Sequence, residues 1–134
     1  MKTIELSYDE AKELLERAVQ EKGPDYVYVG PEGNKAGELG VSCIYFIDEE
    51  TPGCIIGQVL AYKGFTRSDL NTDWAGLPSL NSGSGVLSLR NHEVLQVDDR
   101  TFRLMRETQQ QQDRGVPWGL AVSHALRYTE EVEA

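Results

Sequence analysis

The amino-acid sequence predicts an α+β fold, in which one layer, a small antiparallel sheet, packs against a second layer of three or four helices. Apolar residues recur at helical spacing in several segments, whereas the runs 26–29 and 41–47 are rich in β-branched and aromatic residues. A length of 134 residues, with 40% hydrophobic and 26% charged residues, fits one domain over residues 1–134, and no internal repeat or linker divides it.

The first helix is expected to begin after Ser7. Ser7 and Glu10 form the pattern of a capping box, in which each side chain bonds the backbone amide of the other residue. Gly23 and Pro24 then supply the stop. One face carries the apolar residues Ala11, Leu14, Leu15, Ala18 and Val19. The helix is therefore expected to cover the core with this face.

The two β-type runs are expected to form an antiparallel pair joined by a glycine-rich hairpin connection. A second helix should follow, with Thr51 as N-cap, Pro52 as its first residue and Gly64 at its end. It is apolar over most of its circumference, which is typical of a central helix. Gly57 inside it is tolerable where a neighbouring backbone approaches closely.

The second half is expected to contain a short helix over 68–74, short strands at 86–89 and 93–97, and two long helices. Asp98 should cap the first long helix, which runs to Arg114, and Pro117 should open the second. Residues 76–85 have loop composition and are expected to be mobile. The acidic C-terminal tail is expected to fray from residue 130.

The charge balance limits the classes of partner. Thirteen basic and 22 acidic residues give a net charge of −9, which disfavours nucleic-acid binding and favours a neutral or basic protein partner. No segment has the apolar length of a membrane span or a signal peptide, so we expect a cytoplasmic protein without membrane contact.

Reactive residues do not assemble at local spacing. Cys43 and Cys54 fit neither a redox pair nor a zinc site, and are expected to be small buried hydrophobes. Neither His92 nor His124 has a second ligand nearby in sequence, and His124 is expected to be a half-buried packing residue. We therefore predict no catalytic, cofactor-binding or metal-binding residue, and no enzyme; a thiol enzyme or redox sensor stays an alternative.

A partner-binding surface is predicted instead. Arg100, Arg103 and Arg106 recur every three residues on the first long helix of the second half, and Trp74 lies beside the loop 76–85. The alternative for the arginines is a solvated face, since Asp99 and Glu107 each lie four positions from Arg103.

A second functional hypothesis is a DNA-binding regulator. Residues 55–74 have the outline of a helix-turn-helix, with Gly64 at the turn and Leu70 as an apolar anchor. Asp69 and Asp73 would face the phosphates, which disfavours this hypothesis.

Four short motifs carry a resemblance to small uncharacterised proteins encoded by phages of actinobacteria. They are Tyr26-Val27-Tyr28, Cys43-Ile44-Tyr45, the run from Pro52 to Leu60, and the run from Gln111 to Gly119. The resemblance implies an accessory protein made inside an infected bacterium, and it assigns no activity or site residue. We therefore expect a non-catalytic protein that binds a host or phage protein.

Overall fold

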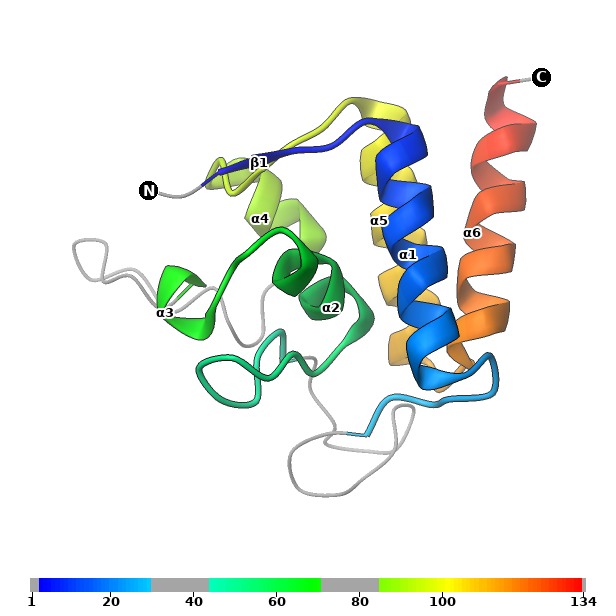
Figure 1. Ribbon diagram of the computed structural model, residues 1–134. Helices are drawn as coiled ribbons and strands as arrows, with labels where there is room; N and C mark the ends of the chain where they lie inside the picture. The colour runs from blue at the N-terminus through cyan, green and yellow to red at the C-terminus, as the bar shows by residue number, and fades with distance from the viewer. Residues whose placement is uncertain (1–2, 30–43, 71–84, 134) are drawn as a thin grey trace.

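Three long helices form one side of the molecule in the computed structural model, which describes residues 3–29, 44–70 and 85–133, with side chains described to residue 130. They are α1 (Tyr8–Lys22), α5 (Asp99–Asp113) and α6 (Trp118–Glu133). Figure 1 shows α1 and α5 running in one direction and α6 running in the opposite one. None of the described helices is long and apolar enough to span a bilayer.

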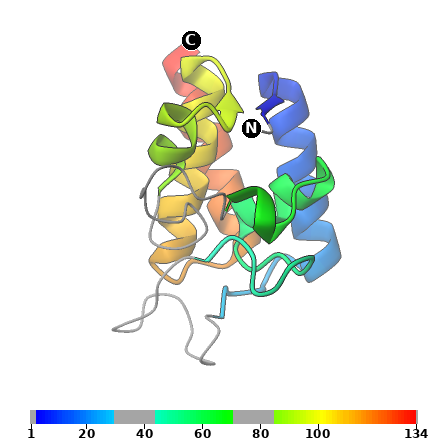
Figure 2. The same cartoon turned by 90° about the vertical axis from the view of Figure 1, so that its left-hand side faces the viewer.

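Three shorter helices cover the other side of the core. They are α2 (Ile55–Tyr62), α3 (Arg67–Leu70) and α4 (Val86–Asn91). In Figure 2, α1 and α5 lie on the two sides of the molecule, with α2 in front of the space between them. The core is therefore enclosed by helices on both sides.

The predicted antiparallel sheet on helices is wrong, because the described chain is mostly helical. Its sheet has two strands, β1 (Ile4–Glu5) and β2 (Leu95–Gln96), and they pair in parallel. Residues 26–28 have no strand structure. In this run Tyr28 is buried in the core, with 1% of its surface exposed. Its hydroxyl accepts a hydrogen bond from the Ile44 amide at 3.2 Å.

The predicted strand at 86–89 is also wrong. These residues begin α4, where Val86 and Leu89 are both buried. Residues three positions apart share one face of a helix, whereas a strand would direct them to opposite faces. Of the predicted strand 93–97, the two residues of β2 are confirmed as a strand.

Each strand leads directly into a long helix. Ile4 pairs with Leu95, and both helices begin four residues after these partners. The predicted caps are confirmed. Ser7 Oγ accepts a hydrogen bond from the Glu10 amide at 3.1 Å, and Asp98 Oδ1 accepts one from the Thr101 amide at 2.8 Å. The Glu10 carboxylate departs from the predicted capping box, because it accepts a hydrogen bond from Lys63 Nζ at 2.9 Å.

Helix α2 begins three residues later than predicted. Pro52 forms an antiparallel bridge with Phe46, and Cys54 is the N-cap. The cap is completed from α5, where Gln112 Oε1 accepts the Ile55 amide at 2.8 Å and Gln109 Nε2 donates to Cys54 Sγ at 3.6 Å. Cys54 is fully buried, as predicted, and Cys43 lies outside the described residues.

The close backbone approach expected at Gly57 is confirmed. A Cβ atom at this position would lie 2.0 Å from the Tyr45 carbonyl oxygen. Helix α2 therefore sits directly on the 44–46 segment, and all residues from Ile55 to Leu60 are buried. The predicted stop is confirmed by the positive φ of 85° at Gly64.

A tight corner joins α5 to α6. Gly115 has a positive φ of 88° after α5. The first α6 amides donate to the N-terminal half of the chain, from Trp118 to Tyr26 O at 2.8 Å and from Gly119 to Pro24 O at 2.9 Å. The buried Trp118 ring packs edge-on to the Tyr26 ring at 4.7 Å. Helix α6 then continues to Glu133, past the residue where fraying was expected.

Candidate functional site

The predicted arginine stripe is divided between two surroundings. The Arg100 guanidinium lies 3.7 Å from the centre of the Tyr8 ring on α1, and the Arg106 guanidinium lies 5.3 Å from the centre of the Phe102 ring. Arg103 lies between them in sequence and is partly buried. Trp74 and residues 76–84 of the predicted loop lie outside the described residues.

The acids expected to neutralise Arg103 are engaged by other residues. Asp99 Oδ1 pairs with Arg90 Nη2 of α4 at 2.7 Å. Glu107 Oε1 pairs with His124 Nε2 of α6 at 3.1 Å. The structure therefore directs these carboxylates to the neighbouring helices, away from Arg103.

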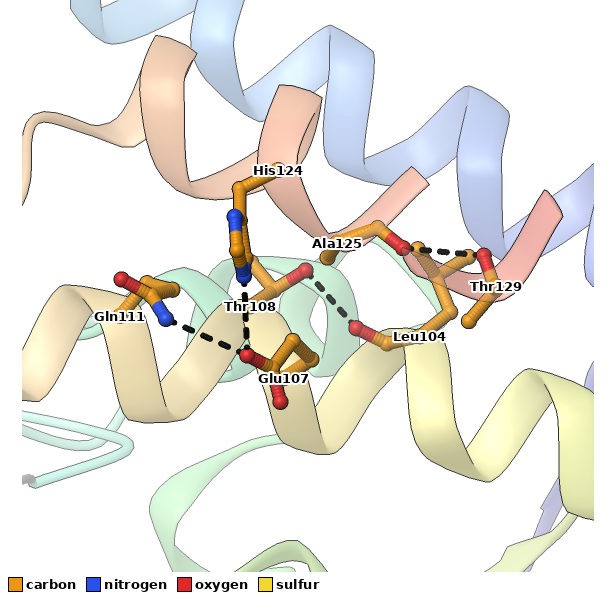
Figure 3. A network of polar contacts seen from close by, with 7 residues as sticks. All are labelled: Leu104, Glu107, Thr108, Gln111, His124, Ala125 and Thr129. Carbon is orange, nitrogen blue, oxygen red and sulfur yellow. Dashed lines mark hydrogen bonds and ion pairs between the residues drawn. The ribbon is translucent and has the colours of Figure 1, made fainter. Parts of the chain in front are cut away.

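Glu107 is the centre of a polar cluster between α5 and α6 (Figure 3). Its Oε1 accepts hydrogen bonds from His124 Nε2 and from Gln111 Nε2 at 3.2 Å. The Glu107 side chain is only 16% exposed, whereas the His124 side chain is 49% exposed, which agrees with the predicted half-buried position. The cluster holds the imidazole ring in one orientation at the surface.

Two buried threonines allow α5 and α6 to pack closely beside this cluster. Thr108 Oγ1 donates to Leu104 O at 2.8 Å, and Thr129 Oγ1 donates to Ala125 O at 2.9 Å (Figure 3). Each hydroxyl donates to the carbonyl four residues back in its own helix. The Thr129 hydroxyl also forms a 2.6 Å hydrogen bond with the Tyr8 hydroxyl, which ties α6 to α1.

Two exposed apolar side chains flank His124 on α6. Leu120 is 63% exposed and Tyr128 is 38% exposed. They lie four residues before and four residues after His124, so the three side chains share one side of the helix. We call Leu120, His124 and Tyr128 the α6 patch.

Leu120 and Tyr128 were not predicted as site residues from the sequence. The packing face of α6 is formed by the buried residues Trp118, Ala121, Val122 and Ala125. The signal that could have revealed the patch is the eight-residue spacing of Leu120 and Tyr128, two large apolar residues that lie outside the packing face of the helix.

The cluster carries a histidine oriented by a carboxylate, which is part of a general-base arrangement. Within the described residues His124 bonds only to Glu107, and no hydroxyl or thiol reaches it. No group of three or more His, Cys, Asp or Glu side chains in the described parts of the chain could hold a metal ion.

The residues of the predicted helix-turn-helix form α2 and α3, which are separated by residues 63–66. In the described residues α3 is four residues long. Its first turn is held by an acid: Glu49 accepts hydrogen bonds from the Ser68 amide at 3.2 Å and the Ser68 hydroxyl at 2.6 Å. The hydroxyl holds the pKa of the Glu49 carboxyl below its usual value, so it stays charged at neutral pH. DNA binding stays a prediction, and these contacts do not favour it.

No known protein family, curated protein or solved structure matches this chain.

Proposed function

We propose that this protein acts by binding another protein through the α6 patch, without catalysing a reaction. The observation that carries this proposal is the exposure of Leu120 and Tyr128 on either side of His124, on a helix whose other large apolar residues up to residue 130 are buried or partly buried. Apolar side chains exposed together on one face are typical of an interaction surface.

The chemistry of the patch suits a protein interface. Burying the exposed part of a leucine contributes about 1–2 kcal/mol at about 25 cal/mol per Å². A tyrosine adds an apolar ring with a polar tip, which is why this residue is common at interfaces. His124 is already oriented by Glu107, so binding would cost little side-chain entropy at this position.

The partner we propose is a host or phage protein in the cytoplasm of an infected bacterium. The resemblance to actinobacterial phage proteins supports this context. The net charge of −9 supports a partner that is neutral or basic overall, since two strongly acidic proteins repel each other.

The test is capture from an actinobacterial lysate, followed by titration of the purified captured protein. The variant Leu120→Glu should weaken binding at least about ten-fold, because it places a charge in the buried part of the interface. Ile47→Glu is the matched control, since Ile47 is 45% exposed on the segment before α2. Equal binding by both variants, or equal loss in both, would contradict the proposal.

A further inference from the structure

We infer that Arg103 and Arg106 form a second recognition site, which binds a short acidic peptide segment. These two residues, the arginine pair, lie on the part of α5 that faces away from the buried side of this helix. The inference goes beyond the α6 patch, because it concerns different residues and a ligand of different chemistry.

The first observation is that neither residue of the arginine pair forms an ion pair within the described residues, although a longer-range Coulombic attraction acts between Arg103 and Asp98. Within the described residues, Lys63, Arg17 and Arg90 each form an ion pair, but neither Arg103 nor Arg106 does. Two guanidinium groups on adjacent turns are therefore available to an external anion.

The second observation is that the nearest acids on α5 are occupied. The Arg90–Asp99 pair is 2.7 Å long, and Glu107 accepts two hydrogen bonds from His124 and Gln111. Asp99 would have to break its ion pair with Arg90 to reach the arginine pair. An external carboxylate would not.

The third observation is that the arginine side chains are partly fixed. Phe102 is 7% exposed, and the guanidinium groups of Arg90 and Arg106 lie 4.8 and 5.3 Å from its ring centre. The Nε atoms of Arg103 and Arg106 are buried. Because the stems are packed, less side-chain entropy is lost when the terminal nitrogens bind a ligand.

The geometry favours a peptide carboxylate pair as the ligand. Residues three positions apart on a helix are separated by about 4.5 Å along the helix axis. Two acidic side chains that are close together in a bound peptide have a similar separation, so each can reach one arginine. Guanidinium groups bind carboxylates with two parallel hydrogen bonds.

A nucleic acid is a poorer ligand for the same pair. Two arginines neutralise few phosphates, and the net charge of −9 repels the rest of the polymer. A short acidic segment avoids this repulsion, because charges beyond about 10 Å are screened at about 0.1 M salt. The protein that carries the segment can still be neutral or basic overall.

The experiment is a titration of the ¹⁵N-labelled full chain with a blocked octaglutamate peptide, followed by NMR at low salt and at about 0.1 M salt. The expected result is a salt-dependent shift of α5 amide signals around residues 103–106. The variant carrying Arg103→Gln and Arg106→Gln should bind about ten-fold more weakly. Arg17→Gln is the matched control, since Arg17 is an exposed α1 arginine already paired with Glu21, and it should bind as the parent does.

A gain of affinity gives a second readout. Asp99→Asn should strengthen octaglutamate binding about three-fold, because it removes a repelling carboxylate and releases Arg90. Absence of binding, binding that both arginine substitutions leave unchanged, or weaker binding by Asp99→Asn would overturn the inference. Tighter binding of an eight-nucleotide single strand than of octaglutamate would overturn the choice of ligand. Loss of partner capture in Leu120→Glu with unchanged octaglutamate binding separates this site from the α6 patch.

Discussion

Replacing Gly57 by alanine is expected to lower the free energy of unfolding by about 3 kcal/mol. In an exposed helix the same change would stabilise by about 1 kcal/mol, because alanine has the higher helix propensity. Here the new methyl group would lie 2.0 Å from the Tyr45 carbonyl oxygen, 2.8 Å from its carbon and 2.9 Å from its Cα. All three atoms belong to backbone, so no side-chain rotation relieves the overlap.

The magnitude follows from what must move. An ordinary contact between carbon and oxygen is about 3.4 Å, so the 44–46 segment and α2 must separate by more than 1 Å. The Tyr45 carbonyl also accepts the Gly53 amide at 2.8 Å, and Tyr45 and Phe46 are fully buried. Overpacking costs about 1–3 kcal/mol, and a buried hydrogen bond broken on one side costs about 1–3 kcal/mol more. The gain in helix propensity offsets about 1 kcal/mol of this sum.

Urea denaturation followed by far-ultraviolet circular dichroism measures the effect. Gly85→Ala is the control, since a Cβ at Gly85 meets nothing within 4 Å, and it should change stability by about 1 kcal/mol or less. An unfolding free energy of Gly57→Ala within 1 kcal/mol of the parent would refute the reasoning. It would mean that α2 can leave the Tyr45 backbone at little cost.

Three further predictions follow from buried or capping groups. Gln112→Leu should destabilise by about 1–3 kcal/mol, because the buried Ile55 amide loses its acceptor, whereas the exposed Gln110→Leu should not; equal effects in denaturation would contradict this. Asp98→Ala should cost about 1 kcal/mol at neutral pH. Its backbone hydrogen bond lowers the pKa of the Asp98 carboxyl, so this stabilisation is present above the ordinary carboxyl pKa and is lost as pH falls; a difference from the parent that persists in acid would count against it. Burial of the hydroxyl, with the Glu21 carboxylate beside it, raises the pKa of Tyr62 to about 12, so stability should be lost as pH rises from 10 to 12. Absorbance at 295 nm should show late phenol titration that is smaller by one residue in Tyr62→Phe, and an unchanged titration curve would exclude this origin.

Features that depend on neighbouring residues were predictable from the sequence. Ser7 and Asp98 cap the helices assigned to them, and Gly64 and Gly115 end helices with positive φ. Each of these signals acts within about four residues, so the rest of the fold does not change its meaning.

Features that depend on distant residues were predicted incorrectly. The aromatic run around Tyr28 is compatible with a strand, yet a strand needs a partner, and here the hydroxyl group of Tyr28 bonds the Ile44 amide from irregular backbone. The parallel pairing of Ile4 with Leu95 leaves no local signal, because two residues are too few to show alternation.

In the candidate site, too, the features set by neighbouring residues were predictable and those set by distant residues were not. The spacing of the arginines on one helix was predictable, but their neighbours were not. Nothing near Glu107 in the sequence indicates that it bonds His124 across two helices. The exposed positions of Leu120 and Tyr128 likewise depend on where α5 packs against α6.

The parallel pairing of the two short strands has a consequence for the order of folding. Joining Ile4 to Leu95 closes a loop of about 90 residues, and closure on this scale costs about 4 kcal/mol of chain entropy. Four backbone residues in register cannot repay that cost by themselves. We therefore expect the N-terminal strand to dock late, after the long helices have collapsed together, because non-local topology of this kind slows the search for the native state.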